Sequence, residues 1–302
     1  MANLYEPITI PDFFQTADYG LLTAVNWLTP TNSRWQNGIT YQADCYALDV
    51  TFDPCIVSGM GTDINKLETW SRSFRGSMPF TTFAEEDCSA PIAYEDGQRQ
   101  VLTALGHQNQ FQLENQLWTG DGRGGMKTYP NLITDGGPIF APGSNNIITL
   151  QPDLLAITGN ARDVVEALGL LEAQMGYCYS GAGVIHVTLE ILEQMCANVL
   201  VYNRGGKLYT WAGNQVVAGR GYISSRGPTA VTAGTSWMFA TSPIFGIQGQ
   251  PRTFEPRESI DRSVNTMKFI AEQTFILGWT CCLIGILVST GGVVQGTAGA
   301  AN

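Results

Sequence analysis

The chain has 302 residues, of which 44% are hydrophobic and only 14% are charged, against about 25% charged residues in a typical soluble domain. A surface with so little charge argues against a solitary soluble monomer, so we expect other copies to cover much of it. The formal net charge of −10, with only four lysines, argues against a protein that grips the phosphate backbone of nucleic acids, which needs clustered cations.

The seven cysteines form an odd set without a CxxC pair, which argues against a zinc site and against a full disulfide framework. We expect scattered reduced thiols, and a link from Cys45 to Cys55 or Cys88 remains the alternative. Residues 1–14 lack the basic region and the continuous apolar core of a secretory signal. We therefore expect synthesis in the cytoplasm.

Residues 1–40 carry several prolines and threonines and isolated aromatic residues, with little periodicity. This composition favours an extended arm that buries its aromatic side chains on a neighbour. The next segment, ITYQADCYALDVTFDPCIV, is rich in β-branched and aromatic residues and predicts a strand. MPFTTFAEEDC, residues 78–88, predicts the strand that returns, so that the two segments form a long two-stranded excursion.

The segment YEDGQRQVLTALGHQNQFQLENQLW, residues 94–118, predicts the clearest helix of the chain. Its apolar residues fall near one face: Val101, Leu102, Leu105, Leu113 and Leu117. GDGRGG, residues 120–125, ends the helix. A phosphate-binding loop has a similar composition, but it opens a helix rather than closing one, so a helix stop followed by a turn is our interpretation.

From residue 160 the pattern alternates between helix and strand. ARDVVEALGLLEAQM predicts a helix that ends at Gly176, GVIHV predicts a short buried strand, and Thr188 is the predicted N-cap of LEILEQMCANVL. KLYTWAGNQVVAGRGYI predicts a hairpin that turns near Gly213 and Asn214. Since WMFATSPIFGIQ then returns to strands, residues 160–232 are predicted to be a small mixed domain inserted into a larger β-rich unit.

The stretch FILGWTCCLIGILVSTGGVV, residues 275–294, lies in a tract without one charged residue, residues 273–302. Its mostly apolar part, residues 275–288, is shorter than the roughly 20 residues that cross a bilayer, and no Lys or Arg follows it. Upstream, Met267, Phe269, Ala271 and Gln273 alternate with other residues in a two-residue period. We predict one long strand that leaves a half-exposed edge and enters a core covered on both faces; a membrane span is the alternative.

The sequence offers no catalytic site. His107 lies mid-helix and His186 inside an apolar strand, so we interpret both as structural. No GxSxG elbow is present, and GGK at residues 205–207 lacks the spacing of a Walker loop. The acidic run Glu85, Glu86 and Asp87 alternates between two faces of a strand, which favours a solvated run over a metal cluster. We expect no enzyme, no cofactor and no metal.

The order of these parts resembles the major capsid protein of tailed bacteriophages, the Hong Kong 97 fold, in particular its actinobacterial-phage versions. The likeness lies in RWQNGITYQADC, PFTTFAEEDCSAP, ENQLWTGDG, GVIHVTLEILEQM, KLYTWAGNQVVAGRGYI and DRSVNTMKFIAEQTFILGWTCCLIGILV. It covers nearly the whole chain. The order of the stretches carries the resemblance, rather than any single motif.

The resemblance implies an α+β fold with an N-terminal arm (1–40), an extension loop (41–92), a peripheral domain (93–159 and 233–302) with a long spine helix and a spine β-strand, and an axial domain (160–232). It implies a shell of hexamers and pentamers in an icosahedral lattice that encloses double-stranded DNA without sequence-specific binding and without a membrane. The particle would assemble in the host cytoplasm and become the virion, with a separate scaffolding protein, a portal and decoration proteins as candidate partners. An encapsulin-type nanocompartment shares the fold and is the alternative.

Three features depart from the family pattern or bear on it. Ala271, Glu272 and Gln273 stand where related sequences tend to have Ala-Glu-Arg, so an ion pair from that arginine is not expected. No long charged helical segment precedes the arm, which favours a separate scaffolding protein. Some relatives crosslink through Lys and Asn, but for Lys66, in the predicted extension loop, a solvated side chain is the favoured interpretation.

Contacts between copies should combine apolar and aromatic anchors with a polar rim. The candidate anchors are Trp27 and Trp35 of the arm, Trp70 and Phe74 of the loop, and Phe80 and Phe83 of the returning strand. Arg72 and Arg75 are candidates to face Glu85, Glu86 or Asp87 of an adjacent loop. For each aromatic residue, packing within its own subunit remains the alternative.

Overall fold

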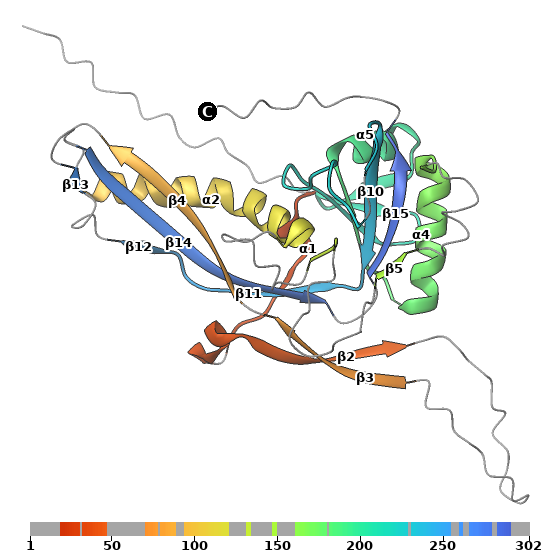
Figure 1. The fold of residues 1–302 in the computed structure, drawn as a ribbon, viewed down its shortest axis with the longest axis horizontal. Helices are drawn as coiled ribbons and strands as arrows, with labels where there is room; N and C mark the ends of the chain where they lie inside the picture. The colour runs from red at the N-terminus through yellow and green to blue at the C-terminus, as the bar shows by residue number, and fades with distance from the viewer. Residues whose placement is uncertain are drawn as a thin grey trace, which may run out of the picture.

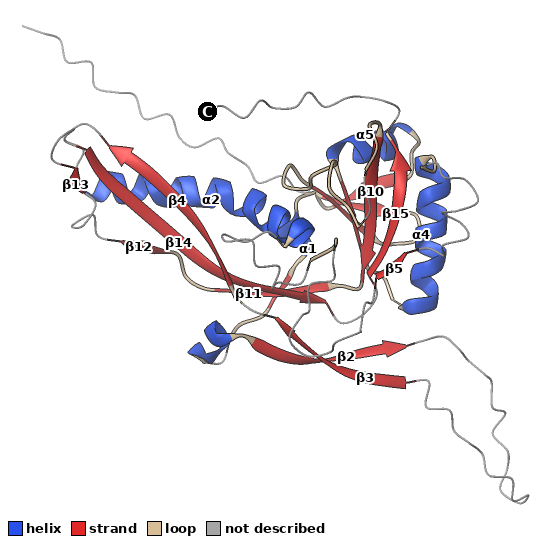
Figure 2. Ribbon diagram, in the orientation of Figure 1, coloured by secondary structure: helices blue, strands red, loops and turns tan. Residues whose placement is uncertain are grey.

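The computed structural model describes residues 19–30, 32–46, 70–77, 79–88, 94–120, 131–133, 147–149, 161–179, 181–228, 231–254, 260–261, 266–279 and 283–290. These residues form a six-stranded sheet, a seven-stranded sheet and a two-stranded ribbon. Long strands and one long helix extend on one side of the molecule, and an α/β unit lies on the other (Figures 1 and 2). The ribbon lies beneath both in this view.

The six-stranded sheet is built around one long strand, β14 (Thr266–Trp279). Along one edge β14 pairs with β4 (Phe80–Cys88); along the other it pairs in turn with β13 (Ile260–Asp261), β12 (Arg252–Phe254) and β11 (Ile244–Gln248), and β1 (Asn26–Trp27) adds to β11. Burial alternates along β14 at Phe269, Ala271 and Gln273 and becomes continuous from Phe275. This confirms the predicted change from a half-exposed strand to one covered on both faces.

Helix α2 (Tyr94–Thr119) extends one residue beyond the predicted helix and lies along the six-stranded sheet (Figure 2). Val101, Leu105 and Leu113 are buried as predicted, but Leu102 is 40% exposed. Because successive helical residues are about 100° apart, Leu102 points away from the sheet when Val101 faces it. The buried face of α2 therefore lacks one residue of the predicted apolar face, Leu102.

A buried polar chain fastens α2 to the sheet. Thr82 Oγ1 donates to Asn109 Oδ1 over 2.6 Å, and Asn109 Nδ2 donates to Gln273 Oε1 over 2.7 Å. Gln273 Nε2 in turn donates to the carbonyl oxygen of Gly249 over 2.8 Å. Each of these donors has an acceptor where water is excluded, so the polar groups are buried without a large desolvation penalty. Gln273 stands where related sequences tend to have an arginine, and it links α2 to the sheet through neutral hydrogen bonds instead of an ion pair.

The ribbon consists of β2 (Ile39–Tyr46) and β3 (Trp70–Ser77), which pair antiparallel from Ile39 opposite Ser77 to Tyr46 opposite Trp70. The prediction that residues 78–88 form the returning strand is wrong. WSRSFRGS returns instead, and β4 pairs over its whole length with β14. Both segments have β-forming composition, so composition could not decide which of them pairs with β2.

The seven-stranded sheet has the order β5 (Ile147–Thr149), β15 (Leu283–Ser289), β10 (Thr235–Thr241), β6 (Val184–Val187), β9 (Gln215–Ala218), β8 (Lys207–Thr210) and β7 (Val201–Arg204). Helices α4 (Val164–Cys178) and α5 (Leu189–Ala197) pack on one of its faces. The predicted buried strand, the N-cap position of Thr188 and the turn at Gly213 are confirmed. The domain boundaries stay predictions, but the sheet draws β5, β10 and β15 from outside residues 160–232.

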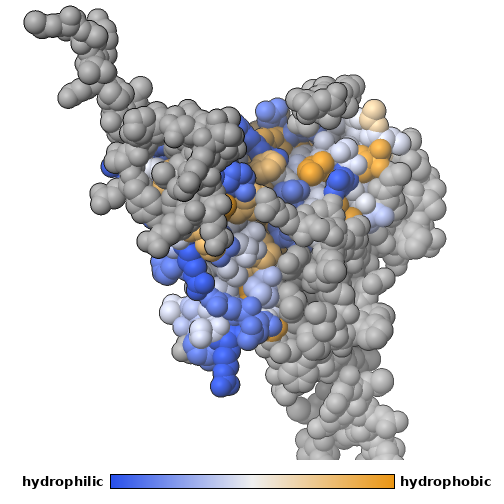
Figure 3. Space-filling model, turned by 60° about the vertical axis from the view of Figure 1, so that its left-hand side comes forward, coloured by the Kyte–Doolittle hydropathy of each residue, from blue (hydrophilic) through white to orange (hydrophobic). Residues whose placement is uncertain are grey.

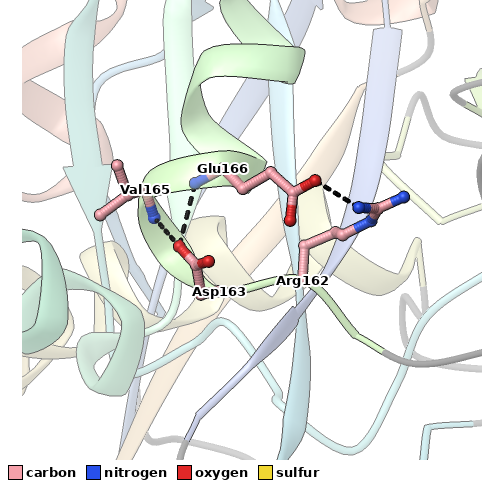
Figure 4. Close-up of polar contacts among 4 residues, drawn as sticks. All are labelled: Arg162, Asp163, Val165 and Glu166. Carbon is pink, nitrogen blue, oxygen red and sulfur yellow. Dashed lines mark hydrogen bonds and ion pairs between the residues drawn. The ribbon is translucent and has the colours of Figure 1, made fainter. Parts of the chain in front are cut away.

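Helix α4 begins three residues later than its predicted segment and continues past Gly176 to Cys178. Asp163 Oδ1 accepts the N–H groups of Val165 and Glu166 over 2.9 and 3.0 Å, which satisfies two of the free donors at the helix start. Arg162 forms an ion pair with Glu166 one turn on (Figure 4). These contacts set the start of the helix beside β15, to which Arg162 forms a backbone bridge at Val288.

The apolar run of residues 275–288 is two strands, where the sequence predicts one. β14 ends at Trp279 in the six-stranded sheet, and β15 begins at Leu283 in the seven-stranded sheet. A strand buried on both faces has the same composition in either sheet, so nothing in the run marks the change of sheet. Among the described residues, no helix is long and apolar enough to cross a membrane.

Candidate functional site

His186 has a structural role, as its sequence context predicts. It is fully buried, with Nδ1 3.0 Å from the hydroxyl of Tyr222 and Nε2 3.1 Å from Oγ1 of Thr241. Burial lowers the pKa of His186 to about 3, so the ring is neutral near pH 7. In the described part of the chain, no three His, Cys, Asp or Glu side chains are placed to hold a metal ion.

A cluster around Trp118 joins α2 to the seven-stranded sheet. The indole of Trp118 is fully buried; it stacks on Tyr222 and meets Phe239 edge-on, with ring centroids 4.9 Å apart in both pairs. Its Nε1–H donates to the carbonyl oxygen of Arg226 over 3.2 Å. Because Phe239 belongs to β10 and Tyr222 follows β9, this one side chain fixes the end of the long helix against the other sheet.

Glu114, one turn before Trp118, joins α2 to two segments that are distant in the sequence. Its carboxylate accepts the backbone N–H of Leu21 over 3.4 Å, the N–H of Gly221 over 3.1 Å and the side-chain amide of Gln110 over 3.0 Å. Only 1% of Glu114 is exposed, and this burial raises the pKa of its carboxyl group. Burial, together with the nearby Glu114, also raises the pKa of the Tyr222 hydroxyl.

Gly221 permits this close approach, and its replacement gives a first prediction. A Cβ at position 221 would meet the carbonyl oxygen of Phe111 and would lie 2.6 Å from Cβ of Glu114. We expect Gly221→Ala to lower the free energy of unfolding by about 1–3 kcal/mol, because the backbone of α2 cannot give way. Denaturant unfolding measures this.

The control for Gly221→Ala is Gly106 on α2, the helix against which Gly221 packs. A Cβ at Gly106 would meet nothing within 4 Å. We expect Gly106→Ala to raise the free energy of unfolding by about 0.5–1 kcal/mol, since alanine favours a helix over glycine. Equal effects of the two substitutions would contradict the close packing at Gly221.

The β2–β3 ribbon is attached to the body near one end. The hydroxyl of Tyr41 donates to the carbonyl oxygen of Trp279 over 3.1 Å, and Oγ of Ser77 donates to that of Leu277 over 2.6 Å. The Tyr41 ring also meets Phe245 edge-on at 4.7 Å. From these contacts the paired strands continue to Tyr46 and Trp70, and among the described residues β2 and β3 form a sheet only with each other.

Three predicted anchors pack on the core of their own chain. Trp35 lies in a cluster with Ile247 and Ile276, Phe80 stacks near Phe275, and each is only 8% exposed. Trp27 is half-buried, with its ring 5.9 Å from that of Phe275 and its Nε1–H bonded to the carbonyl oxygen of Leu22. The described part of the predicted arm is therefore held on the body. A contact of these residues with a neighbouring copy stays a prediction.

The other predicted contact residues lie on β3 and β4. The backbone N–H and carbonyl groups of Phe83 bond the side chain of Gln112, and Glu85 forms an ion pair with Lys268 at 3.4 Å, with both side chains about 40% exposed. The side chains of Trp70, Arg72, Phe74, Arg75 and Glu86, like Lys66, lie outside the described residues. Their contacts with a neighbour stay predictions.

The chain resembles several solved structures, although no protein-family model and no curated protein matches its sequence. Among solved structures the chain resembles the SrpI encapsulin of Synechococcus elongatus, with a TM-score of 0.50 and 11% identity over 91% of this chain and 89% of that one. It also resembles the capsid of Ralstonia phage GP4, with a TM-score of 0.49 and 9% identity over 96% and 98%. For Mycobacterium phage Che8 the TM-score is 0.46 and the identity 11%, over 94% and 96%.

The first of these likenesses establishes the fold. At 11% identity it shows the fold alone, a mixed α+β fold of the Hong Kong 97-like type. The predicted fold class is confirmed at this level.

Proposed function

We propose that this protein is the subunit of a closed icosahedral shell, formed by self-assembly. The observation that carries the proposal is the β2–β3 ribbon, which leaves the body as a two-stranded sheet of its own. An isolated two-stranded hairpin is marginally stable in water, so a second surface is needed to hold it. A neighbouring copy supplies that surface in a repeated, geometrically closed contact.

The surface also suits a protein covered by its neighbours. Only 14% of the residues are charged, and apolar patches interrupt the polar surface on the face drawn in Figure 3. Leu28, Phe111 and Phe254 are each about half exposed. In an assembly, neighbouring copies can cover exposed apolar area of this kind, whereas on a solitary monomer it stays in contact with water.

Within this class, the protein is the major capsid protein of a tailed phage of the actinobacterial type, which encloses double-stranded DNA. The ordered sequence likeness over nearly the whole chain supports this, and so does the net charge of −10, since an acidic shell does not hold packaged DNA firmly. The arm, extension loop, peripheral domain and axial domain then keep their predicted ranges. Hexamers and pentamers form the lattice, with a portal, a separate scaffolding protein and decoration proteins as partners.

The alternative is the shell of an encapsulin-type nanocompartment. The structural likeness to the SrpI encapsulin supports this candidate as well, because the fold is common to both and does not separate them. The two candidates share the assembly and differ in what the shell contains.

Contacts between copies follow from the position of the ribbon. Strand β3, which extends from the body, carries Trp70, Arg72, Phe74 and Arg75. The two aromatic residues are the proposed anchors on a neighbouring copy, and the two arginines are the proposed polar rim of that contact. The Glu85–Lys268 ion pair is exposed, and such pairs contribute little stability. Glu85 can therefore exchange Lys268 for an arginine of an adjacent loop at small cost.

The contents of the particle test the finer proposal. Particles purified from the native source without detergent, and treated with nuclease, should contain protected double-stranded DNA of one defined length. Protected DNA supports the capsid. Particles that instead contain a packaged protein and no nucleic acid would contradict the capsid and support the nanocompartment.

A further inference from the structure

Four residues at one edge of the seven-stranded sheet, Val199, Tyr202, Tyr209 and Trp211, form what we call the aromatic edge. Trp211 is 70% exposed, yet its Nε1–H donates to the carbonyl oxygen of Val199 over 2.9 Å. Its ring lies 5.1 Å from that of Tyr202, which lies 6.1 Å from that of Tyr209. The exposed ring is thus already ordered, so a partner that packs on it loses little conformational entropy.

Val199 is the second unusual feature of this edge. It follows the C-cap of α5 with φ at +55°, and it is 66% exposed. The N–H of Val199 bonds the carbonyl oxygen of Cys196 and that of Leu200 bonds Met195, a helix ending whose left-handed position usually holds glycine. A β-branched residue is strained there, so glycine would suit the fold better. The exposed valine therefore points to a use of its side chain outside the subunit.

The outer face of α4 offers a matching surface. Val165 is 50% exposed, and Gly169, Ala173 and Gly176 follow it as exposed positions. A Cβ at Gly169 or Gly176 would meet nothing within 4 Å, so the face is smooth and open. Figure 4 shows Val165 in the first turn of the helix, beside the ion pair of Arg162 and Glu166.

Charge distinguishes the two surfaces. Residues 199–214, which contain the aromatic edge, carry Arg204 and Lys207 and no carboxylate. Residues 162–178, which are α4 and its cap, carry Asp163, Glu166 and Glu172 against one cation, Arg162, which pairs with Glu166. Glu172 accepts hydrogen bonds from Thr210 and Asn214 of its own chain, so the segment keeps a net negative charge. The apolar parts of the two surfaces can pack while the charges on their rims attract each other.

We propose that the aromatic edge of one copy binds the exposed face of α4 on a second copy of this chain. The proposal rests on the proposed shell function and names one of its contacts. The two surfaces do not meet within one chain, because α4 packs its buried face on the sheet that carries the aromatic edge, so that its exposed face points away from that sheet. A contact between two different surfaces is head-to-tail, and repeated by rotation it closes a ring.

The test separates folding from assembly at Val199. Val199→Gly should leave the melting temperature unchanged or raise it by about 2–4 °C, because it relieves the strained φ. The same variant should raise the protein concentration needed for assembly by roughly tenfold or more, because it removes an exposed anchor. Val199→Ile is the matched control: it keeps the strain and the apolar side chain, and should assemble as wild type does. Sedimentation velocity measures the assembly.

A second pair of variants tests the head-to-tail geometry. Trp211→Ala lacks the projecting ring, and Val165→Asp places a charge on the receiving face, at a helix position that favours an acid. Each variant alone should remain monomeric in sedimentation at micromolar concentration. A one-to-one mixture should form dimers, because the intact α4 face of the first can receive the intact aromatic edge of the second.

The outcomes separate this contact from the shell itself. Wild-type assembly concentrations for both Val199→Gly and Trp211→Ala would overturn the proposal, and so would a mixture that stays monomeric. If Trp211→Ala fails to fold, Val199→Gly still decides. A wild-type protein that forms no closed shell, with a mixture that still dimerises, would overturn the shell function and leave the contact standing.

Discussion

Replacement of Trp118 by alanine should lower the free energy of unfolding by about 3–5 kcal/mol, the range for a large aromatic side chain removed from a core. The substitution removes the stacking on Tyr222, the edge contact with Phe239 and the hydrogen bond to Arg226. It also removes the side chain that fixes α2 against the seven-stranded sheet. If the chain builds the proposed shell, we therefore expect a loss of assembly under conditions where the subunit remains folded.

The comparison for Trp118→Ala is Phe111→Ala on the same helix. Phe111 is 50% exposed, so its truncation should change the free energy of unfolding by less than about 1 kcal/mol. Denaturant unfolding of both variants gives the two values. A loss below about 1 kcal/mol for Trp118→Ala would contradict the view that this side chain joins α2 to the seven-stranded sheet.

Acid should destabilise the protein through His186. Its pKa in the fold is about 3, well below the usual 6.5 of a histidine, so below pH 6.5 the unfolded chain binds a proton that the folded chain excludes. The stabilisation is complete above pH 6.5 and is lost as the pH falls toward 3, by at most about 1.4 kcal/mol per pH unit and roughly 4–5 kcal/mol in total. Glu114 acts in the opposite direction, since its raised pKa favours the protonated fold.

Two variants isolate the contribution of His186. His186→Gln removes the titrating group, so its free energy of unfolding should depend less steeply on pH between 6.5 and 3 than that of wild type. Thr241→Val removes the partner of Nε2 and keeps the buried histidine, so it should lower stability at every pH without flattening the profile. An unchanged slope in His186→Gln would show that other groups govern the acid sensitivity.

Periodic segments could be predicted from the sequence alone. The bounds of α2 agree to one residue, and the buried strand at His186, the start of α5 after Thr188 and the turn at Gly213 follow from the expected patterns. In each case the local sequence and the fold favour the same structure. The alternation along β14 that gives way to a continuous apolar run was readable for the same reason.

Strand partners could not be predicted in this way. β3 and β4 are both rich in β-forming residues, and only pairing over long sequence distances decides that β3 returns along β2 while β4 joins β14. The break between Trp279 and Leu283 is hidden for a related reason, because both strands are buried on both faces. Trp35 and Phe80 show the same difficulty, since an isolated aromatic residue does not reveal whose core it enters.

The residues of the junction and of the aromatic edge gave weaker signals. Glu114 stands among polar helix formers and looks like a solvated residue; only the glycines at 219 and 221, far away in the sequence, hint at a close approach. Val199 itself, rather than a glycine or asparagine, stands at the left-handed position after α5, so the sequence does not mark this helix ending. The positive φ of Val199, and the hydrogen bond that orders the Trp211 ring, are visible only in three dimensions.

The mass and shape of the assembled protein test the central claim most directly. Light scattering and electron microscopy of material from its native source, without detergent, should show closed icosahedral particles of uniform diameter, with a mass many times the 32.7 kDa of one chain. A small soluble species, or one that needs detergent to remain in solution, would contradict the claim that this chain builds a shell.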